Sequence, residues 1–124
     1  MDDILQNWLD RYLVAWRSNE PDDIRALFTD NATYAGSPWD AEPWVGADAI
    51  VAGWRAHRDE PGTWTFEGAP LALTAGTGII QGRTDYAGGS VYANLWVIEF
   101  AEDGRARSFV EWAVEPGPVW EDQE

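Results

Sequence analysis

The carboxylate of Glu111 is the group in this sequence best placed to move a proton. It lies among Phe109, Val110 and Trp112, and such an apolar setting disfavours the charged carboxylate. A setting of this kind suits a general acid or base near neutral pH, which typically contributes about 10²–10⁴-fold to a rate. Two other interpretations stay open. In the first, Glu111 is a structural residue held by Asn94 or an arginine. In the second, its side chain faces solvent.

Two other side chains, Tyr12 and Asn94, are candidate hydrogen-bond donors to a ligand oxygen. The hydroxyl of Tyr12 would donate to a carbonyl or enolate, and the alternative is a core tyrosine on an amphipathic stripe. Asn94 would bind a ligand oxygen or orient Glu111, because a buried amide needs a partner. A purely structural pair of Asn94 with Glu111 is the other interpretation.

Other side chains suggest a lined pocket. His57, at the expected end of a helix, is a candidate proton carrier, although a cation there also complements the helix dipole. Asp40 lies in a loop that would cover a pocket, or it is an ordinary turn residue. Four tryptophans predict an aromatic cage for a flat apolar or cationic ligand, with core packing as the alternative. They are Trp39, Trp44, Trp54 and Trp96.

The apolar spacing predicts helices first and strands second. Helices are predicted over residues 3–18, 21–31 and 47–57, with a short strand at 32–34 and a loop at 36–46. From residue 63 onward the period becomes two, which is typical of strands. Four strands are predicted over 63–73, 77–87, 90–101 and 105–115, and their short connections make them antiparallel neighbours.

The composition fits one domain with a cavity. We interpret residues 1–124 as a single domain, with a core over about 3–115 and an acidic tail over 116–124. Apolar residues make up 45% of the chain, which is enough for a core. Because each of the nine tryptophans can bury roughly 150–250 Å², some of them should line a cavity or an interface.

The charge and the absence of cysteine exclude several classes of function. All eight basic residues are arginine, and the net charge of −14 argues against nucleic acid and anionic membranes as partners. With no Cys and one His, Cys-based and His-cluster metal sites are excluded, and we expect no cofactor. The acidic N-terminus does not resemble a signal peptide, and no apolar run approaches the roughly 20 residues of a membrane span. We therefore expect a cytoplasmic protein.

The predicted order of elements resembles the nuclear transport factor 2-like superfamily, which includes ketosteroid isomerases, SnoaL-type polyketide cyclases and limonene epoxide hydrolases. The local marks are Tyr12 in RYLVAW, Ala26-Leu27-Phe28, Asn31-Ala32-Thr33, and Gly46 leading into Asp48-Ala49-Ile50. The resemblance implies an α+β cone, in which a curved antiparallel sheet wraps around three N-terminal helices and encloses a pocket. It implies little about activity, because this fold hosts many functions.

The resemblance also implies which side chains face the pocket. The inward set is Ile80, Gly82, Thr84, Tyr86, Asn94, Trp96, Phe109 and Glu111. A slip of one residue in any strand would reverse its assignment. The opposite face carries Leu95, Val97, Val110, Trp112 and Val114, an apolar surface that in this fold is often a dimer interface. We expect a homodimer, with the C-terminal segment around Trp120 as the alternative cover.

The comparison with ketosteroid isomerase is incomplete. Tyr12 stands where that family keeps its oxyanion-donating tyrosine, but the second donor, an acid, becomes Trp96. The position of the catalytic Asp falls near Gly36 or Ser37, so isomerisation by that mechanism is not expected. The arginine of the Asp-Arg-Asp set in limonene epoxide hydrolases has no counterpart that we can place. Glu111 occupies a location comparable to the essential Asp of SnoaL-type cyclases.

On this resemblance, the leading hypothesis is a cofactor-independent isomerase, cyclase or dehydratase that acts on an apolar, ring-containing carbonyl compound. Glu111 would move the proton, and Tyr12 with Asn94 would hold the oxygen. The expected ligand-binding residues are Tyr34, Trp39, Trp44, Trp54, His57, Tyr86, Trp96 and Phe109. The alternative is a non-catalytic ligand-binding or dimeric interaction module.

Overall fold

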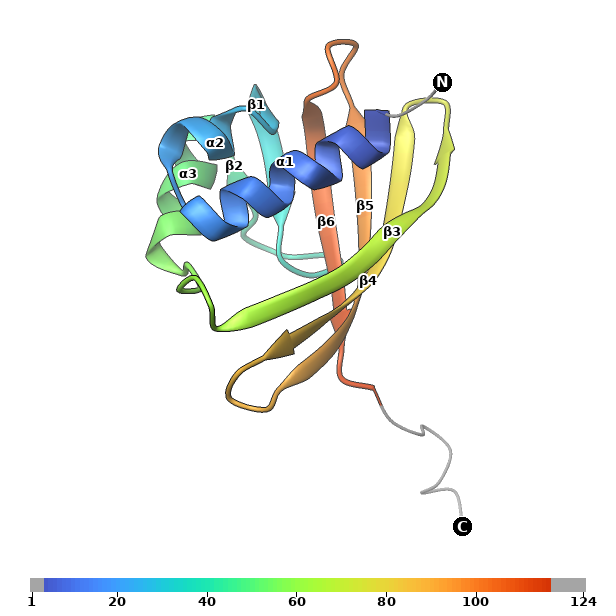
Figure 1. Cartoon of the computed structure of the whole chain (residues 1–124). Coiled ribbons are helices and arrows are strands. Elements are labelled where there is room, and N and C mark those ends of the chain that lie inside the picture. Colours follow the sequence, from blue (N-terminus) through green and yellow to red (C-terminus); the bar gives the residue numbers. More distant parts are fainter. Residues whose placement is uncertain (1–3, 117–124) are drawn as a thin grey trace.

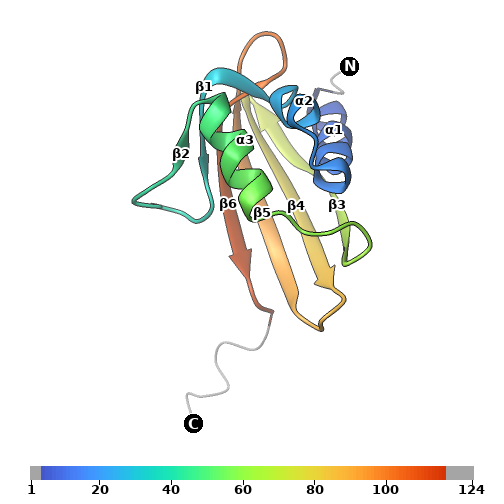
Figure 2. The ribbon, with the colours of Figure 1, turned by 90° about the vertical axis from the view of Figure 1, so that its left-hand side faces the viewer.

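In the computed structural model, which describes residues 4–116, three helices precede most of a six-stranded sheet and cover one of its faces (Figure 1, Figure 2). The helices are α1 (Ile4–Ser18), α2 (Pro21–Arg25) and α3 (Ala47–Ala56). The strands are β1 (Phe28–Ala35), β2 (Trp44–Val45), β3 (Trp64–Thr74), β4 (Thr77–Tyr86), β5 (Val91–Phe100) and β6 (Ala106–Val114). None of the helices in this range is long and apolar enough to cross a membrane.

The sheet has the strand order β2-β1-β6-β5-β4-β3. The four long strands β3 to β6 are antiparallel neighbours, as predicted. However, β1 runs parallel to β6, so the sheet is mixed rather than antiparallel throughout. Figure 1 shows that the sheet is curved and that α1 lies across it. The predicted α+β cone is therefore confirmed in its helices, its long strands and its curvature.

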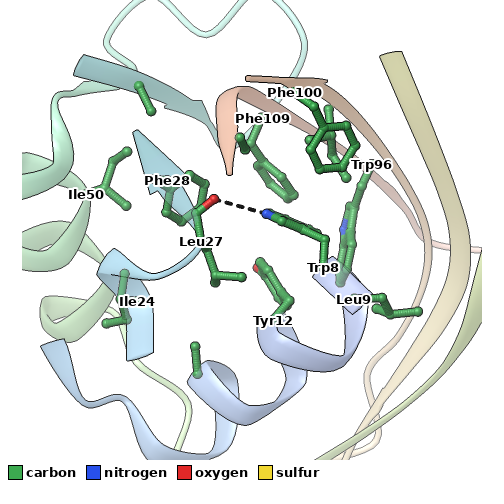
Figure 3. Close-up of a cluster of buried hydrophobic side chains, with 14 of the residues drawn as sticks. Trp8, Leu9, Tyr12, Ile24, Leu27, Phe28, Ile50, Trp96, Phe100 and Phe109 are labelled. Carbon is green, nitrogen blue, oxygen red and sulfur yellow. Dashed lines mark hydrogen bonds between the residues drawn. The ribbon is translucent and has the colours of Figure 1, made fainter. Parts of the chain in front are cut away.

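Helix α1 anchors the core through Trp8. Its side chain is fully buried, and the indole N–H donates to the carbonyl oxygen of Leu27 at 3.0 Å (Figure 3). The ring stacks on Phe109 with a centroid distance of 5.9 Å. A buried indole donor costs free energy unless it is paired, so this bond fixes the position of α1 against the α2–β1 corner.

The second helix is shorter than predicted. It ends at Arg25 instead of Asn31, and β1 begins at Phe28. The carbonyl oxygen of Leu27 accepts from the backbone N–H of Ala106 at 2.8 Å, and Phe28 pairs with Ala106 across to β6. The apolar spacing of this short run fits a helix and a strand equally well, and the pairing with β6 decides between them.

The predicted loop over residues 36–46 ends in the short strand β2. Trp44 pairs with Tyr34 of β1, and the Trp44 ring stacks on the Tyr34 ring with centroids 4.9 Å apart. The ring also lies directly on α3, because a Cβ atom added at Gly53 would meet it at 2.2 Å. The absence of a side chain at Gly53 therefore lets Trp44 reach the interior.

The predicted inward phase of the sheet is confirmed. Ile80, Thr84, Trp96 and Phe109 are all buried. In the strand register, Gly82 of β4 lies beside Asn94 of β5, and Trp96 of β5 lies beside Glu111 of β6. These pairings bring the polar side chains of β5 and β6 together on the concave face.

Candidate functional site

A cavity of about 490 Å³ lies between α1, α3 and the concave face of the sheet. This volume falls within the range of small-molecule sites. Its aromatic lining consists of Tyr12, Trp16, Tyr34, Trp44, Trp54, Tyr86, Tyr92 and Trp96. Its polar lining consists of His57, Arg58, Asp59, Thr84, Ser90, Asn94 and Glu111. The lining therefore combines eight aromatic residues with seven polar ones, so the cavity offers both ring surfaces and hydrogen-bond partners.

Glu111 presents its carboxylate to the cavity with one oxygen already engaged. Oε2 accepts from the side-chain amide of Asn94 at 2.7 Å and from the indole N–H of Trp96 at 2.9 Å. Both groups can only donate to it, so Oε2 cannot take up a proton while these bonds persist. Among residues 4–116, no side chain donates to Oε1. A proton accepted by Glu111 would therefore go to Oε1.

Asn94 is itself held in one orientation. The hydroxyl of Thr84 donates to Asn94 Oδ1 at 2.7 Å, and both side chains are buried. Because Oδ1 accepts this bond, the amide nitrogen must face Glu111. Asn94 thus pairs with Glu111, and this bond fits both the orienting role and the purely structural pair that the sequence left open. The sequence analysis placed Thr84 on the inward face but did not predict its bond to Asn94, since a lone threonine in a strand gives no sign of its partner.

Two tyrosine hydroxyls meet in the same cavity. The hydroxyl oxygens of Tyr12 and Tyr34 lie 3.3 Å apart, so one donates to the other. Burial raises the pKa of Tyr12 well above its usual value, and the charges of Tyr34 and Glu111 raise it further. Burial, and after it the negative charge of Glu111, likewise raises the pKa of Tyr34. Both hydroxyls therefore remain neutral donors at any physiological pH.

Asp59, in the turn after α3, is a second cavity carboxylate that the sequence analysis missed. Its Oδ2 accepts from the indole N–H of Trp16 at 3.1 Å and from the hydroxyl of Tyr86 at 3.3 Å. Partial burial, followed by the charge of Asp59 and this hydrogen bond, raises the pKa of Tyr86 to about 12. The backbone carbonyl of Asp59 accepts from Asn19 at 3.2 Å, which ties the turn to the end of α1.

Most of the predicted ligand-binding residues line the cavity. These are Tyr34, Trp44, Trp54, His57, Tyr86 and Trp96. Trp39 does not, because the loop carries it away from the cavity and leaves its side chain 95% exposed. Phe109 faces inward but is completely buried beneath the cavity, where it packs against Trp8 and Tyr34.

Asp40 closes a turn. Its two carboxylate oxygens accept from the backbone N–H groups of Gly36 at 3.2 Å and Glu42 at 2.9 Å. This is the ordinary local role of a turn aspartate. Over residues 4–116, no group of three or more His, Cys, Asp or Glu side chains is arranged to hold a metal ion.

Comparisons with known proteins agree with this architecture. The family described as SnoaL-like domain matches residues 9–109. A protein of unknown function from Burkholderia xenovorans LB400, described as NTF-2 like, superimposes with a TM-score of 0.74 at 19% identity, covering 98% of this chain and 92% of the other. A ketosteroid isomerase-like protein from Erwinia carotovora atroseptica SCRI1043 has a TM-score of 0.65 at 13% identity, with 91% and 95% covered. No curated protein matches the sequence significantly.

The raised tyrosine pKa values predict a loss of stability in alkali. Unfolded tyrosines ionise near pH 10, whereas the buried hydroxyl of Tyr34 keeps its proton, so the unfolded state binds fewer protons above about pH 10. The free energy of unfolding, measured with urea, should therefore begin to fall as the pH rises past about 10 and continue to fall above it. The fall should be shallower in Tyr34→Phe than in the wild type. Parallel pH profiles for the two proteins would contradict this assignment.

Proposed function

The chain belongs to the SnoaL-like domain family, and on that premise we propose that it binds a small, largely apolar ring compound and moves a proton on it without a cofactor. The observation that carries this proposal is the state of the Glu111 carboxylate. One oxygen is held by Asn94 and Trp96, no side chain among residues 4–116 donates to the other, and the residue lines an aromatic cavity of about 490 Å³. A carboxylate held in this way has the orientation that a general base needs.

The proposed reaction begins at a carbon next to a carbonyl group. Glu111 Oε1 takes the proton from this carbon, and the C–H electron pair forms a carbon–carbon double bond. The carbonyl π pair then moves onto the oxygen, which becomes an enolate. The neutral hydroxyls of Tyr12 and Tyr34 line the same cavity, and one of them donates to this oxygen. In a β,γ-unsaturated ketone, return of the proton to the γ-carbon re-forms the carbonyl group and completes an isomerisation, whereas return to the original carbon regenerates the substrate.

The cavity walls support a ring compound as the ligand. The Trp96 ring is held in place by Phe66, which stacks on it at 4.9 Å with an angle of 7° between their planes, and the Trp44 and Tyr34 rings stack on each other. Such fixed aromatic surfaces offer apolar contact area at little cost in conformational entropy. A flat substrate would gain contact with these rings, while its carbonyl group reached the hydroxyl pair.

We also propose that two copies of the chain pair through the outer face of the sheet. Leu95 lies beside Trp112, and Val97 lies beside Val110 in the register of β5 and β6. Trp112 is 42% exposed. Because these neighbouring positions carry no charge, two copies with a net charge of −14 would approach best through them. The alternative cover, the segment around Trp120, lies outside the described residues.

The proton-transfer proposal predicts base-catalysed deuterium exchange. In D₂O, the protein should accelerate the loss of the acidic C–H signal of 2-tetralone, a ring ketone, followed by NMR. Glu111→Gln should slow the protein-dependent rate by about 10²-fold or more, because the amide cannot accept the proton. The matched control is Glu102→Gln in an exposed hairpin turn, which should exchange at the wild-type rate. Binding without Glu111-dependent exchange of this or other ring ketones would favour the non-catalytic ligand-binding module.

The pairing proposal predicts a dimer that Trp112→Glu dissociates. A buried tryptophan at an interface is often worth 2 kcal/mol or more, so the dissociation constant should rise at least about 30-fold. Sedimentation velocity over a range of concentrations measures it. Trp39→Glu makes the same change on an exposed loop and should leave the dimer intact. A wild-type chain that stays monomeric at high concentration would refute the pairing.

A further inference from the structure

The part of the cavity around Asp59 has a chemistry that the proposed proton transfer does not use. Oδ2 accepts from Trp16 and Tyr86, which fixes the orientation of the carboxylate. Over residues 4–116, no side chain donates to Oδ1. Asp59 is only partly buried and lines the cavity. It therefore offers an oriented anionic acceptor to whatever enters.

Three aromatic rings accompany this acceptor. Trp16, Tyr86 and Tyr92 all line the cavity. Tyr86 and Tyr92 meet nearly at right angles, with centroids 6.0 Å apart. Trp16 is fixed from behind, because it stacks on Trp64 with centroids 3.8 Å apart and an angle of 13°. Tyr86 and Tyr92 are thus steeply inclined to one another, and the face of an aromatic ring attracts a cation.

No basic side chain of the described residues neutralises Asp59. The nearest arginine in sequence, Arg58, instead pairs with Glu60 at 3.4 Å and donates to the backbone carbonyl of Arg55 at 2.9 Å. His57 also lines the cavity but is exposed, and its ring stacks near Trp44. The charge of the whole chain, −14, adds a negative potential that favours the entry of cations.

We propose that Asp59, Trp16, Tyr86 and Tyr92 form a subsite for the cationic nitrogen of the ligand. The open Oδ1 of Asp59 calls for an N–H donor, so the group is a protonated primary or secondary amine on the ring compound. This inference rests on the proposed function of the cavity and narrows its substrate class to amine-bearing ring compounds. Glu111 acts on the carbon framework, while Asp59 holds the charged nitrogen.

The subsite predicts selectivity by charge among ligands of nearly equal size. The probes are 2-phenylethylammonium, 2-phenylethanol and phenylacetate, which are cationic, neutral and anionic respectively. Binding is followed by isothermal titration calorimetry, with quenching of tryptophan fluorescence as a second readout. The ammonium probe should bind about tenfold more tightly than the alcohol, and the carboxylate should bind most weakly.

Asp59→Asn tests the role of the carboxylate, since its amide oxygen can still accept from Trp16 and Tyr86. This variant should bind the alcohol as the wild type does and lose most of its preference for the ammonium probe. Glu102→Gln is the matched control, because it removes the same charge from an exposed position that does not line the cavity. It should keep the preference. If Asp59→Asn does not fold, Tyr92→Leu replaces it, and the ratio of ammonium to alcohol affinity should fall about threefold or more.

The outcomes separate this inference from the function on which it rests. Equal affinity for the ammonium probe and the alcohol would overturn the cationic subsite and leave the ring-binding cavity standing. The cationic subsite would also be overturned if Asp59→Asn, or its replacement Tyr92→Leu, kept the wild-type preference for the ammonium probe. That preference would then come from the overall charge of the chain. If none of the three probes binds at millimolar concentration, the proposed ligand-binding function fails together with the subsite.

Discussion

The two N–H groups that meet Oε2 of Glu111 are the interaction on which the cavity depends. A carboxylate among aromatic rings loses part of its hydration, which costs free energy. Hydrogen-bond donors from the protein must replace the lost water for the folded state to remain stable. Asn94 and Trp96 supply these donors, and Thr84 fixes the amide of Asn94. All these donors are neutral, so no arginine or lysine cancels the charge. Among residues 4–116, no side chain donates to its second oxygen.

This arrangement depends on the strand register more than on any single side chain. Trp96 lies directly beside Glu111, and Asn94 lies two residues away along β5 on the same face. A slip of one residue would turn Glu111 to the outer face and leave both donors unpaired. The core helps to prevent such a slip. Trp8 stacks on Phe109, two residues before Glu111 in β6, and its indole bond to Leu27 holds α1 in place.

Much of this architecture was predictable from the sequence, because the period-two pattern of the long strands divides each strand into two faces. The family resemblance, rather than the pattern, indicated that Asn94, Trp96 and Glu111 lie on the inward face. Local spacing did not determine the end of α2, where pairing of Phe28 with β6 overrides a helix-like pattern. Asp59 was missed because its partners, Trp16 and Tyr86, are 43 and 27 residues away in the chain. Trp39 was misplaced because composition alone does not tell which loop side chains turn outward.

The most direct test of the account is a crystal structure of the protein with 2-tetralone bound. We predict that the acidic carbon lies about 3–3.5 Å from Oε1 of Glu111, the distance at which a proton can be taken, while Oε2 keeps its bonds to Asn94 and Trp96. The ketone oxygen should lie within hydrogen-bond distance of Tyr12 or Tyr34. A ligand outside this cavity, or one bound only after Oε2 has left its two donors, would contradict the account.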